Sequence, residues 1–352
     1  MMSCHRNVLI VGPSWVGDMV MAQSLFKSLH QQISDLRLSV LAPSWSLPLV
    51  DRMPEVETGI PTPFKHGRLS IRERVQLASK LRAQNFDQAI ILPRSFKAAL
   101  VPFLAGIPLR TGFLGEKRYG VLNDIRQHNH VERPRTVEQF VHLGRTKGVI
   151  PQQSNTRPKL VANPRFAKKI FERLEIPLTE KPVLAICPGA AFGPAKRWPI
   201  NHFAQVARAQ LQKGWQVWLI GSTEDALITA EISSINFPNL YDLAGLTRLD
   251  EVVDLLSAAN CVITNDSGLM HIAAAVEAPV IAIYGSTSPK INPPLSDQAA
   301  ILWEELSCSP CHKRSCPLGH TNCLYQLPVG RVLKLLESFD APNTTIKSRC
   351  VP

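Results

Sequence analysis

The chain has 352 residues, of which 45% are hydrophobic and 19% are charged, values typical of a folded globular protein. This length exceeds that of one ordinary core and predicts two domains of about 150–180 residues each. Its 39 lysines and arginines against 28 aspartates and glutamates leave a formal charge of +11, which indicates either anionic partners or general solubility.

The basic residues of the first half lack the aromatic-interleaved pattern of a nucleic-acid module, so nucleic acid is not expected as a partner. A basic cleft or a membrane-facing surface is expected instead. No apolar run approaches the roughly 18 residues that span a bilayer. The short run 8–11 is bounded by Gly12 and Pro13, which predicts a buried strand rather than a signal peptide. We therefore expect a cytoplasmic protein.

Short apolar runs alternate with amphipathic stretches, a pattern that predicts βαβ units and parallel sheets. In the first half we expect strands at 7–12, 37–41 and 87–92, and helices at 17–31, 70–84, 95–104 and 136–147. The Arg- and Gly-rich stretch from 107 to 134 has a looser pattern.

Residues 150–165 hold three prolines among polar residues, as a linker would. A helix at 164–174 follows, then strands at 183–187, 217–220, 261–264 and 280–283, with helices at 199–213, 224–234, 248–258, 267–276 and 329–339. We predict an α/β fold of two doubly wound Rossmann-like domains, 1–163 and 164–327, then a helix at 328–340 and a tail at 341–352. Ligands of such sheets bind beyond the carboxyl ends of the strands.

The first candidate site follows strand 7–12. Gly12 and Gly17 allow close backbone approach, and the next helix offers N–H groups to an anion, although the dinucleotide fingerprint G-x-G-x-x-G is absent. Asp18 lies in the first helical turn, where a carboxylate is often only a partner of the helix dipole. Alternatively, Asp18 is a general base, because an ordinary aspartate is ionised at neutral pH and accepts a hydroxyl proton.

The second candidate is the Gly-rich loop from Gly189 to Pro199, which ends in Lys196 and Arg197. These two cations could neutralise a diphosphate leaving group without a metal ion. The P-loop spacing is absent, and an exposed basic turn is the alternative.

The third candidate is the segment 264–271. Backbone N–H groups near Ser267 and Gly268 would point at a phosphate, whereas Asp266 would hold a sugar hydroxyl or orient the loop. His271 lies one turn further on the face of Ser267. A capping box explains Asp266 and Ser267 with no function at all.

Two weaker candidates lie in neighbouring loops: Glu224, as a hydrogen-bond acceptor for a ribose, and Leu246, as an apolar contact for an adenine.

Four cysteines lie close together as Cys308-x2-Cys311-x4-Cys316-x6-Cys323. Four thiols can hold a structural zinc ion, but only one C-x-x-C knuckle is present. A reduced loop, or a disulfide under oxidising conditions, is the alternative.

Several enzyme classes lack support. The chain has no D-x-D triplet, so a magnesium-dependent glycosyltransferase built on paired carboxylates is not expected. It also has no G-x-S-x-G, no H-E-x-x-H and no kinase motif set.

In this order, these loops resemble glycosyltransferase family nine, the heptosyltransferases of lipopolysaccharide inner-core synthesis, from about Asn7 to about Leu336. The segments 17–20, 196–199 and 265–271 carry the resemblance. The segments 92–100 and 110–113 and the cysteine loop are similar to the heptosyltransferase II branch, except at Arg94, where that branch often has Asn.

The resemblance implies a GT-B fold, with a cleft between two Rossmann-like domains and a C-terminal helix that crosses back to the first domain. It implies an inverting enzyme that transfers L-glycero-D-manno-heptose from ADP-heptose to the lipid-linked heptosyl-Kdo-lipid A core, as the second heptose, with no cofactor required for catalysis. Such an enzyme would be cytoplasmic and peripheral at the inner face of the inner membrane.

By the resemblance, Asp18 is the base, Lys196 contacts the diphosphate, and Asp266, Ser267, Gly268 and His271 line the donor site. With the loop analysis, the expected donor residues are Gly17, Gly189, Lys196, Arg197, Glu224, Leu246, Asp266, Ser267, Gly268 and His271. The expected acceptor residues are Arg94, Ser95, Lys97, Arg110 and Arg118. Two alternatives stay open: an inverting transferase with another donor or a first-heptose acceptor, and a non-catalytic nucleotide-binding regulator.

Overall fold

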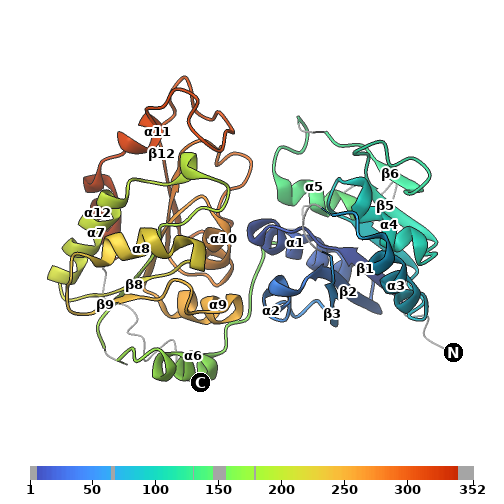
Figure 1. The fold of residues 1–352 in the computed structure, drawn as a ribbon, viewed down its shortest axis with the longest axis horizontal. Helices are drawn as coiled ribbons and strands as arrows, with labels where there is room; N and C mark the ends of the chain where they lie inside the picture. Colours follow the sequence, from blue (N-terminus) through green and yellow to red (C-terminus); the bar gives the residue numbers. More distant parts are fainter. Residues whose placement is uncertain (1–5, 65–67, 130, 146–155, 178–179, 340–352) are drawn as a thin grey trace. The chain divides into compact units, whose positions relative to one another are not determined.

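The computed structural model describes residues 6–64, 68–129, 131–145, 156–177 and 180–339, and it divides into two compact units, 1–158 and 159–352. The division falls close to the expected boundary after residue 163. Most of the expected linker and the tail at 341–352 lie outside the described residues. Each unit is a parallel sheet between layers of helices (Figure 1).

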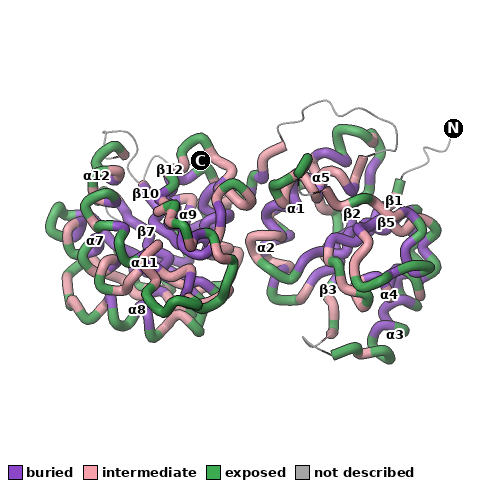
Figure 2. The backbone as a smooth tube through the Cα atoms, turned by 90° about the horizontal axis from the view of Figure 1, so that it is seen from above, coloured by how far each residue is buried: buried purple, intermediate pink, exposed green. Residues whose placement is uncertain are grey.

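The first unit contains a six-stranded parallel sheet in the order β3-β2-β1-β4-β5-β6. Its strands are β1 (Arg6–Val11), β2 (Leu36–Pro43), β3 (Thr58–Thr62), β4 (Gln88–Ile91), β5 (Leu109–Phe113) and β6 (Asp124–Arg126). Its helices are α1 (Val16–Gln32), α2 (Leu47–Val50), α3 (Ile71–Arg82), α4 (Phe96–Leu104) and α5 (Thr136–Leu143), with a 3-10 turn at Ser44–Ser46. The central strand β1 is apolar and buried because helices cover both faces of the sheet (Figure 2).

The loose stretch 107–134 contains β5 and β6, two strands that the sequence pattern did not predict. Their inward side chains are polar and bond to one another across the sheet. Gln88 Nε2 donates to Thr111 Oγ1 at 2.8 Å, and Thr111 Oγ1 donates to Asp124 Oδ2 at 2.9 Å. A chain of hydrogen bonds therefore replaces apolar alternation here, which is why the strand signal was weak.

The second unit contains another six-stranded parallel sheet, in the order β12-β11-β10-β7-β8-β9. Its strands are β7 (Val183–Cys187), β8 (Gln216–Leu219), β9 (Leu240–Asp242), β10 (Cys261–Asn265), β11 (Val280–Tyr284) and β12 (Ala299–Trp303). Its helices are α6 (Pro164–Arg173), α7 (Ile200–Gln212), α8 (Ala226–Ser233), α9 (Leu249–Ala258), α10 (Gly268–Ala275), α11 (Asn322–Tyr325) and α12 (Val329–Phe339), with 3-10 turns at Pro194–Lys196 and Thr223–Asp225. The edge strands β9 and β12 were not predicted, because their residues are only partly buried.

The C-terminal helix packs in the second unit. Val332 and Leu336 of α12 are fully buried in a core with Trp198 and Phe203, and α12 contacts α7. We expected this helix to cross back to the first domain. Its apolar face instead completes the core of the second unit, because α7 presents a matching apolar face there.

Both sheets have the same topology when the strands are numbered within each unit: 3-2-1-4-5-6, the Rossmann order. The strand order reverses between β1 and β4 in the first unit and between β7 and β10 in the second. Ligands of such sheets bind at these switch points. No helix among the described residues is both long and apolar enough to cross a membrane.

Candidate functional site

The loops after β7 and β10 meet at the switch point of the second unit. Asn265, at the end of β10, is fully buried; its amide donates to Pro188 O at 2.7 Å, and its Oδ1 accepts from Trp198 N at 3.0 Å. Because both ends of the amide are satisfied, Asn265 joins the two loops rather than binding a ligand.

Lys196 and Asp266 form an ion pair across this junction. The Lys196 Nζ to Asp266 Oδ2 distance is 2.6 Å, and the side chains are only 13% and 6% exposed. Thr287, after β11, donates its hydroxyl to the same carboxylate oxygen, and the Lys196 ammonium lies 5.0 Å from the ring centroid of Phe192. Asp266 therefore orients Lys196. Of the two roles predicted for Asp266, this contact favours orientation of the loop over binding of a sugar hydroxyl.

The first turn of α10 lies next to this pair. Ser267 has the extended backbone of an N-cap residue, but its hydroxyl makes no cap hydrogen bond and lies 3.2 Å from Thr264 Oγ1. The capping box considered from the sequence is therefore not formed. The N–H groups at the start of α10, beginning at Gly268, therefore receive no hydrogen bond from the Ser267 side chain, and N–H groups at a helix N-terminus can bind an anion.

His271 is buried one turn into α10. Burial lowers the pKa of His271 to about 4; the charge of Lys196 lowers it further, and that of Asp266 opposes the shift. The imidazole is therefore neutral at pH 7. His271 can offer a hydrogen bond to a donor substrate but not a positive charge.

Gly189 and Arg197 shape the loop around Lys196. A Cβ on Gly189 would clash with Asp225 Oδ1. The other oxygen of this carboxylate accepts the Ser222 N–H at 2.9 Å, so the Asp225 side chain is held in place and favours glycine at position 189. Arg197 donates to Ala190 O at 3.3 Å and so bonds to the start of its own loop. Glu224 and Leu246 are exposed on neighbouring loops of the same unit.

In the first unit, Gly17 and Asp18 lie where expected, in the first turn of α1 at the switch point beside β4. Gly12 directly follows β1, and a Cβ there would lie 2.7 Å from Met19 Cε and 3.3 Å from Leu41 O. Asp18 is half-buried in this first turn. Its role as the general base stays a prediction.

Two of the predicted acceptor residues have structural roles. Arg118 is fully buried and donates to Pro93 O at 2.8 Å, Ser95 O at 3.1 Å and Phe113 O at 2.5 Å. Burial lowers the pKa of Arg118 to about 10, which still leaves it charged at pH 7. Arg118 therefore cannot also bind a substrate.

Arg110 is also held by the protein, since it donates to Val121 O at 2.7 Å and Ile107 O at 2.5 Å. Arg118 connects the segment after β4 to the end of β5, and Arg110 connects the residues on either side of its own strand. Arg110 is half-buried, and its acceptor role stays a prediction. Arg94, Ser95 and Lys97 lie after β4, at the switch point, and Arg94 is exposed.

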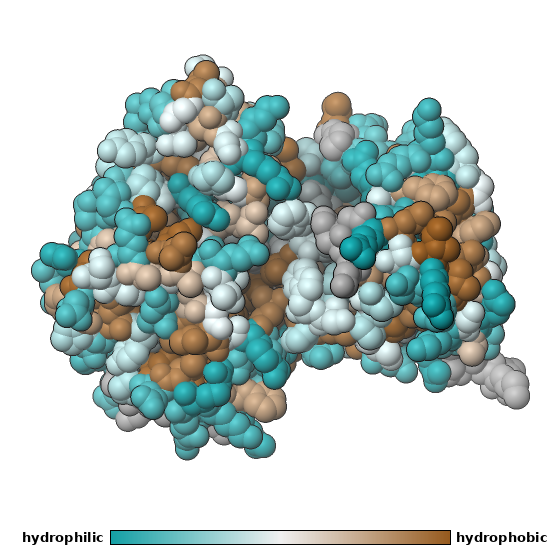
Figure 3. Space-filling model, viewed as in Figure 1, coloured by the Kyte–Doolittle hydropathy of each residue, from teal (hydrophilic) through white to brown (hydrophobic). Residues whose placement is uncertain are grey.

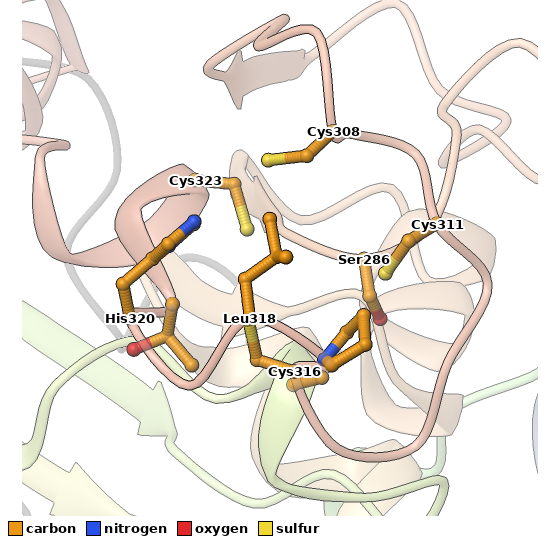
Figure 4. A pocket seen from close by; sticks show the side chains of 10 residues that line it. Ser286, Cys308, Cys311, Cys316, Leu318, His320 and Cys323 are labelled. Carbon is orange, nitrogen blue, oxygen red and sulfur yellow. The ribbon is translucent and has the colours of Figure 1, made fainter.

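The four clustered cysteines surround one cavity together with Ser286, Leu318 and His320 (Figure 4). All four are free thiols of intermediate exposure. Within the described part of the chain, no group of three or more His, Cys, Asp or Glu side chains already encloses a metal position. Backbone N–H groups of residues 318–321 lower the pKa of Cys316, whereas burial and the neighbouring cysteines raise the pKa of Cys323.

Comparison with known proteins decides the family. The profile of glycosyltransferase family 9 (heptosyltransferase) matches residues 74–322. The chain belongs to this family. It is 41% identical over 341 residues to lipopolysaccharide heptosyltransferase 2 of Escherichia coli, covering 94% of this chain and 98% of that protein. It is 45% identical to lipooligosaccharide heptosyltransferase 2 of Haemophilus influenzae, covering 84% and 88%.

The family is also evident in the fold. The crystal structure of E. coli ADP-heptose lipopolysaccharide heptosyltransferase II is similar with a TM-score of 0.86 and 38% identity, over 95% of this chain and 98% of that one. The GT-B class and the heptosyltransferase family expected from the sequence are therefore confirmed.

Sequence analysis missed the residues that support Lys196. These are Thr287, Phe192 and Asn265. Thr287 had a usable signal: it follows Gly285 and Ser286 just after β11, in the same kind of Gly-bearing strand end that marked the other loops.

Proposed function

We propose that this protein transfers L-glycero-D-manno-heptose from ADP-heptose to the heptosyl-Kdo-lipid A inner core of lipopolysaccharide, with inversion at the anomeric carbon. One observation carries the proposal. The Lys196–Asp266 pair and the uncapped first turn of α10 lie together at the switch point of the second unit, in a chain that is 41% identical to lipopolysaccharide heptosyltransferase 2.

The donor diphosphate would bind to the second unit. An ammonium group has three N–H donors, and Asp266 uses one of those of Lys196, so the others are available to phosphate oxygens. The N–H groups of α10 supply further donors and the positive end of a helix dipole. These fixed charges would stabilise the negative charge that develops on ADP as it leaves.

The acceptor would bind to the first unit, with Asp18 as the general base. Inversion requires a base on the face of the sugar opposite the leaving group. Arg94, Ser95 and Lys97 would contact the anionic groups of the inner core near Asp18.

The reaction is tested by incubating the purified protein with ADP-heptose and heptosyl-Kdo-lipid A and measuring the product mass. We expect a gain of one heptose, and none when Kdo-lipid A without heptose is the acceptor. Asp18→Asn should lower kcat by at least about 100-fold while urea unfolding stays unchanged within about 1 kcal/mol. A variant with full activity would exclude Asp18 as the base.

Donor titration separates the alternatives. Calorimetry should detect ADP binding but not UDP or GDP binding. Tight UDP binding with no ADP binding would support a transferase with another donor. ADP binding without any mass gain on either acceptor would support a nucleotide-binding regulator.

We also propose that the enzyme associates peripherally with the inner face of the inner membrane through the first unit. Exposed apolar side chains lie on α3 and α4, among them Ile71 (60% exposed) and Phe103 (43% exposed). On the face seen in Figure 3, hydrophobic residues gather between hydrophilic ones. Lysines and arginines of the same helices would attract anionic lipids.

Vesicle flotation tests this association. The protein should float with vesicles that contain phosphatidylglycerol, less with phosphatidylcholine alone, and less at high salt. Phe103→Ser should reduce flotation, whereas the matched control Leu227→Ser, at an exposed apolar position of the second unit, should not. Equal flotation of all three proteins would refute the assignment of the surface.

A further inference from the structure

The cysteine loop, residues 307–323, contains little that burial could hold in place. Ser309 is its only buried residue within the described structure, and most of the others are exposed. A segment with so small an apolar core generally needs a cross-link or a metal ion to keep one conformation.

The four thiols lie around one place. Cys308, Cys311, Cys316 and Cys323 all line the same cavity, and Figure 4 shows the side chain of Cys308 extending toward Cys323. None forms a disulfide. Two of them form the C-x-x-C pair of a metal knuckle.

The turn after Cys316 resembles the other half of such a site. The backbone of residues 318–321 folds around the Cys316 sulfur. Backbone N–H groups placed in this way orient a metal-binding sulfur.

A buried hydroxyl also lacks a partner at this cavity. Ser286 is 1% exposed and lines the cavity beside Cys311, yet its Oγ makes no hydrogen bond within the described structure. An unsatisfied buried donor costs about 1–3 kcal/mol, and a metal-bound thiolate would accept its hydrogen bond.

We propose that Cys308, Cys311, Cys316 and Cys323 bind one zinc ion. The four thiols lose their protons to solvent as the Zn–S bonds form, and nothing is oxidised or reduced. Zinc suits a set of four sulfur ligands without an open position, which makes the site structural rather than catalytic. The four side chains do not enclose a metal position in the described structure, so they must turn toward a common centre when the ion binds.

With zinc bound, the cysteine loop would support the turn that carries Lys196. Ala195 N donates to Arg314 O at 3.0 Å, His312 N donates to Ser286 O at 2.7 Å, and Ser309 Oγ donates to Gly285 O at 2.8 Å. A Cβ on Gly193 would lie 2.5 Å from Arg314 O, so the two loops are in close contact. Loss of the ion should therefore loosen the Lys196 turn. This consequence for the donor rests on the proposed function, whereas zinc binding does not.

Metal content is the primary test. The full chain, purified under reducing conditions without chelator, should contain one zinc per chain by elemental mass spectrometry. Cobalt added to the demetallated protein should give the charge-transfer absorption of a tetrahedral thiolate site. Cys316→Ser should lose both signals, and Lys313→Ala, an exposed change in the same loop, should keep them.

Intact mass and thermal unfolding complete the test. Zinc should protect the four thiols from alkylation and raise the Tm of the native protein but not of Cys316→Ser. Three results would each overturn the proposal. The first is zinc content at background level, and the second is iron in place of zinc. The third is an intact mass of the native chain that is lower by the four hydrogens lost when two disulfides form. One zinc per chain with no ADP binding would leave the metal site standing and contradict the proposed function alone.

Discussion

The pairing of Lys196 with Asp266 predicts an asymmetric response to mutation. At 2.6 Å the pair has a gross Coulomb attraction of ~6 kcal/mol at an effective dielectric constant of about 20, most of which offsets desolvation. Lys196→Met leaves the Asp266 carboxylate buried with only Thr287 as a partner. We expect it to lower the free energy of unfolding by about 3 kcal/mol.

Asp266→Asn should lower the free energy of unfolding by less, about 1 kcal/mol. The amide can still accept hydrogen bonds from Thr287 and Lys196, and the ammonium group is the more exposed of the two partners. The double variant should therefore be more stable than the sum of the single effects predicts, with a coupling energy of about 1–2 kcal/mol. Urea unfolding at pH 7 measures all three values.

The same variants separate folding from donor binding. Lys196→Met should weaken ADP binding about 10- to 100-fold by calorimetry, because a charge-assisted contact to phosphate is lost. Lys290→Met is the matched control, since Lys290 pairs with Glu305 at 3.0 Å on the surface. This variant should lower the free energy of unfolding by less than about 1 kcal/mol. Equal single effects with no coupling would refute the pairing, and unchanged ADP binding would refute the donor role of Lys196.

Three further predictions concern single positions. Gly189→Ala should destabilise the fold by about 2 kcal/mol through its contact with Asp225, and a second change, Asp225→Ala, should restore part of the loss in urea unfolding. His271 has a pKa of about 4 in the folded protein and about 6.5 in the unfolded chain, so the unfolded state binds more protons between these pH values. The free energy of unfolding therefore falls as the pH drops through this window. Between pH 7 and pH 5, the His271→Asn variant should lose about 2 kcal/mol less of this free energy than the parent, as measured by urea unfolding. In urea unfolding, Arg118→Met should lower the free energy of unfolding by about 3 kcal/mol, because three carbonyls lose their donor. Arg94→Ala should change this free energy by less than about 0.5 kcal/mol and should instead raise the KM for the acceptor in steady-state kinetics.

The sequence predicted the strands that are buried on both faces, because a short, continuous apolar run bounded by glycine or proline fits a buried strand better than a loop or an exposed helix. The runs that became β7, β10 and β11 are examples. It failed at β5, where polar residues are buried through hydrogen bonds between strands. Such bonds join positions far apart in the chain and leave no periodic signal.

Site prediction succeeded and failed for a related reason. Gly-bearing strand ends located the Lys196 and Asp266 loops, since topology brings the carboxyl ends of neighbouring parallel strands together. The expected acceptor contact at Arg118 was wrong, because this arginine is fully buried and bonds to carbonyl groups of its own unit. Sequence cannot distinguish an arginine that recognises a ligand from one that satisfies buried backbone, because both require the same guanidinium.

The charge balance of the donor site follows from these contacts. An unpaired lysine beside a helix N-terminus would be repelled by the dipole and would adopt many rotamers. Asp266 removes both problems, because it holds the ammonium group in one orientation and neutralises it while no phosphate is bound. In the proposed donor site, the Asp266 carboxylate would also limit the affinity for the donor, since it would compete with phosphate for Lys196 and would repel the phosphate. Because charge on the diphosphate grows as the bond to the sugar breaks, a partly neutralised lysine would stabilise the transition state more than the bound donor, which is the condition for a fast reaction.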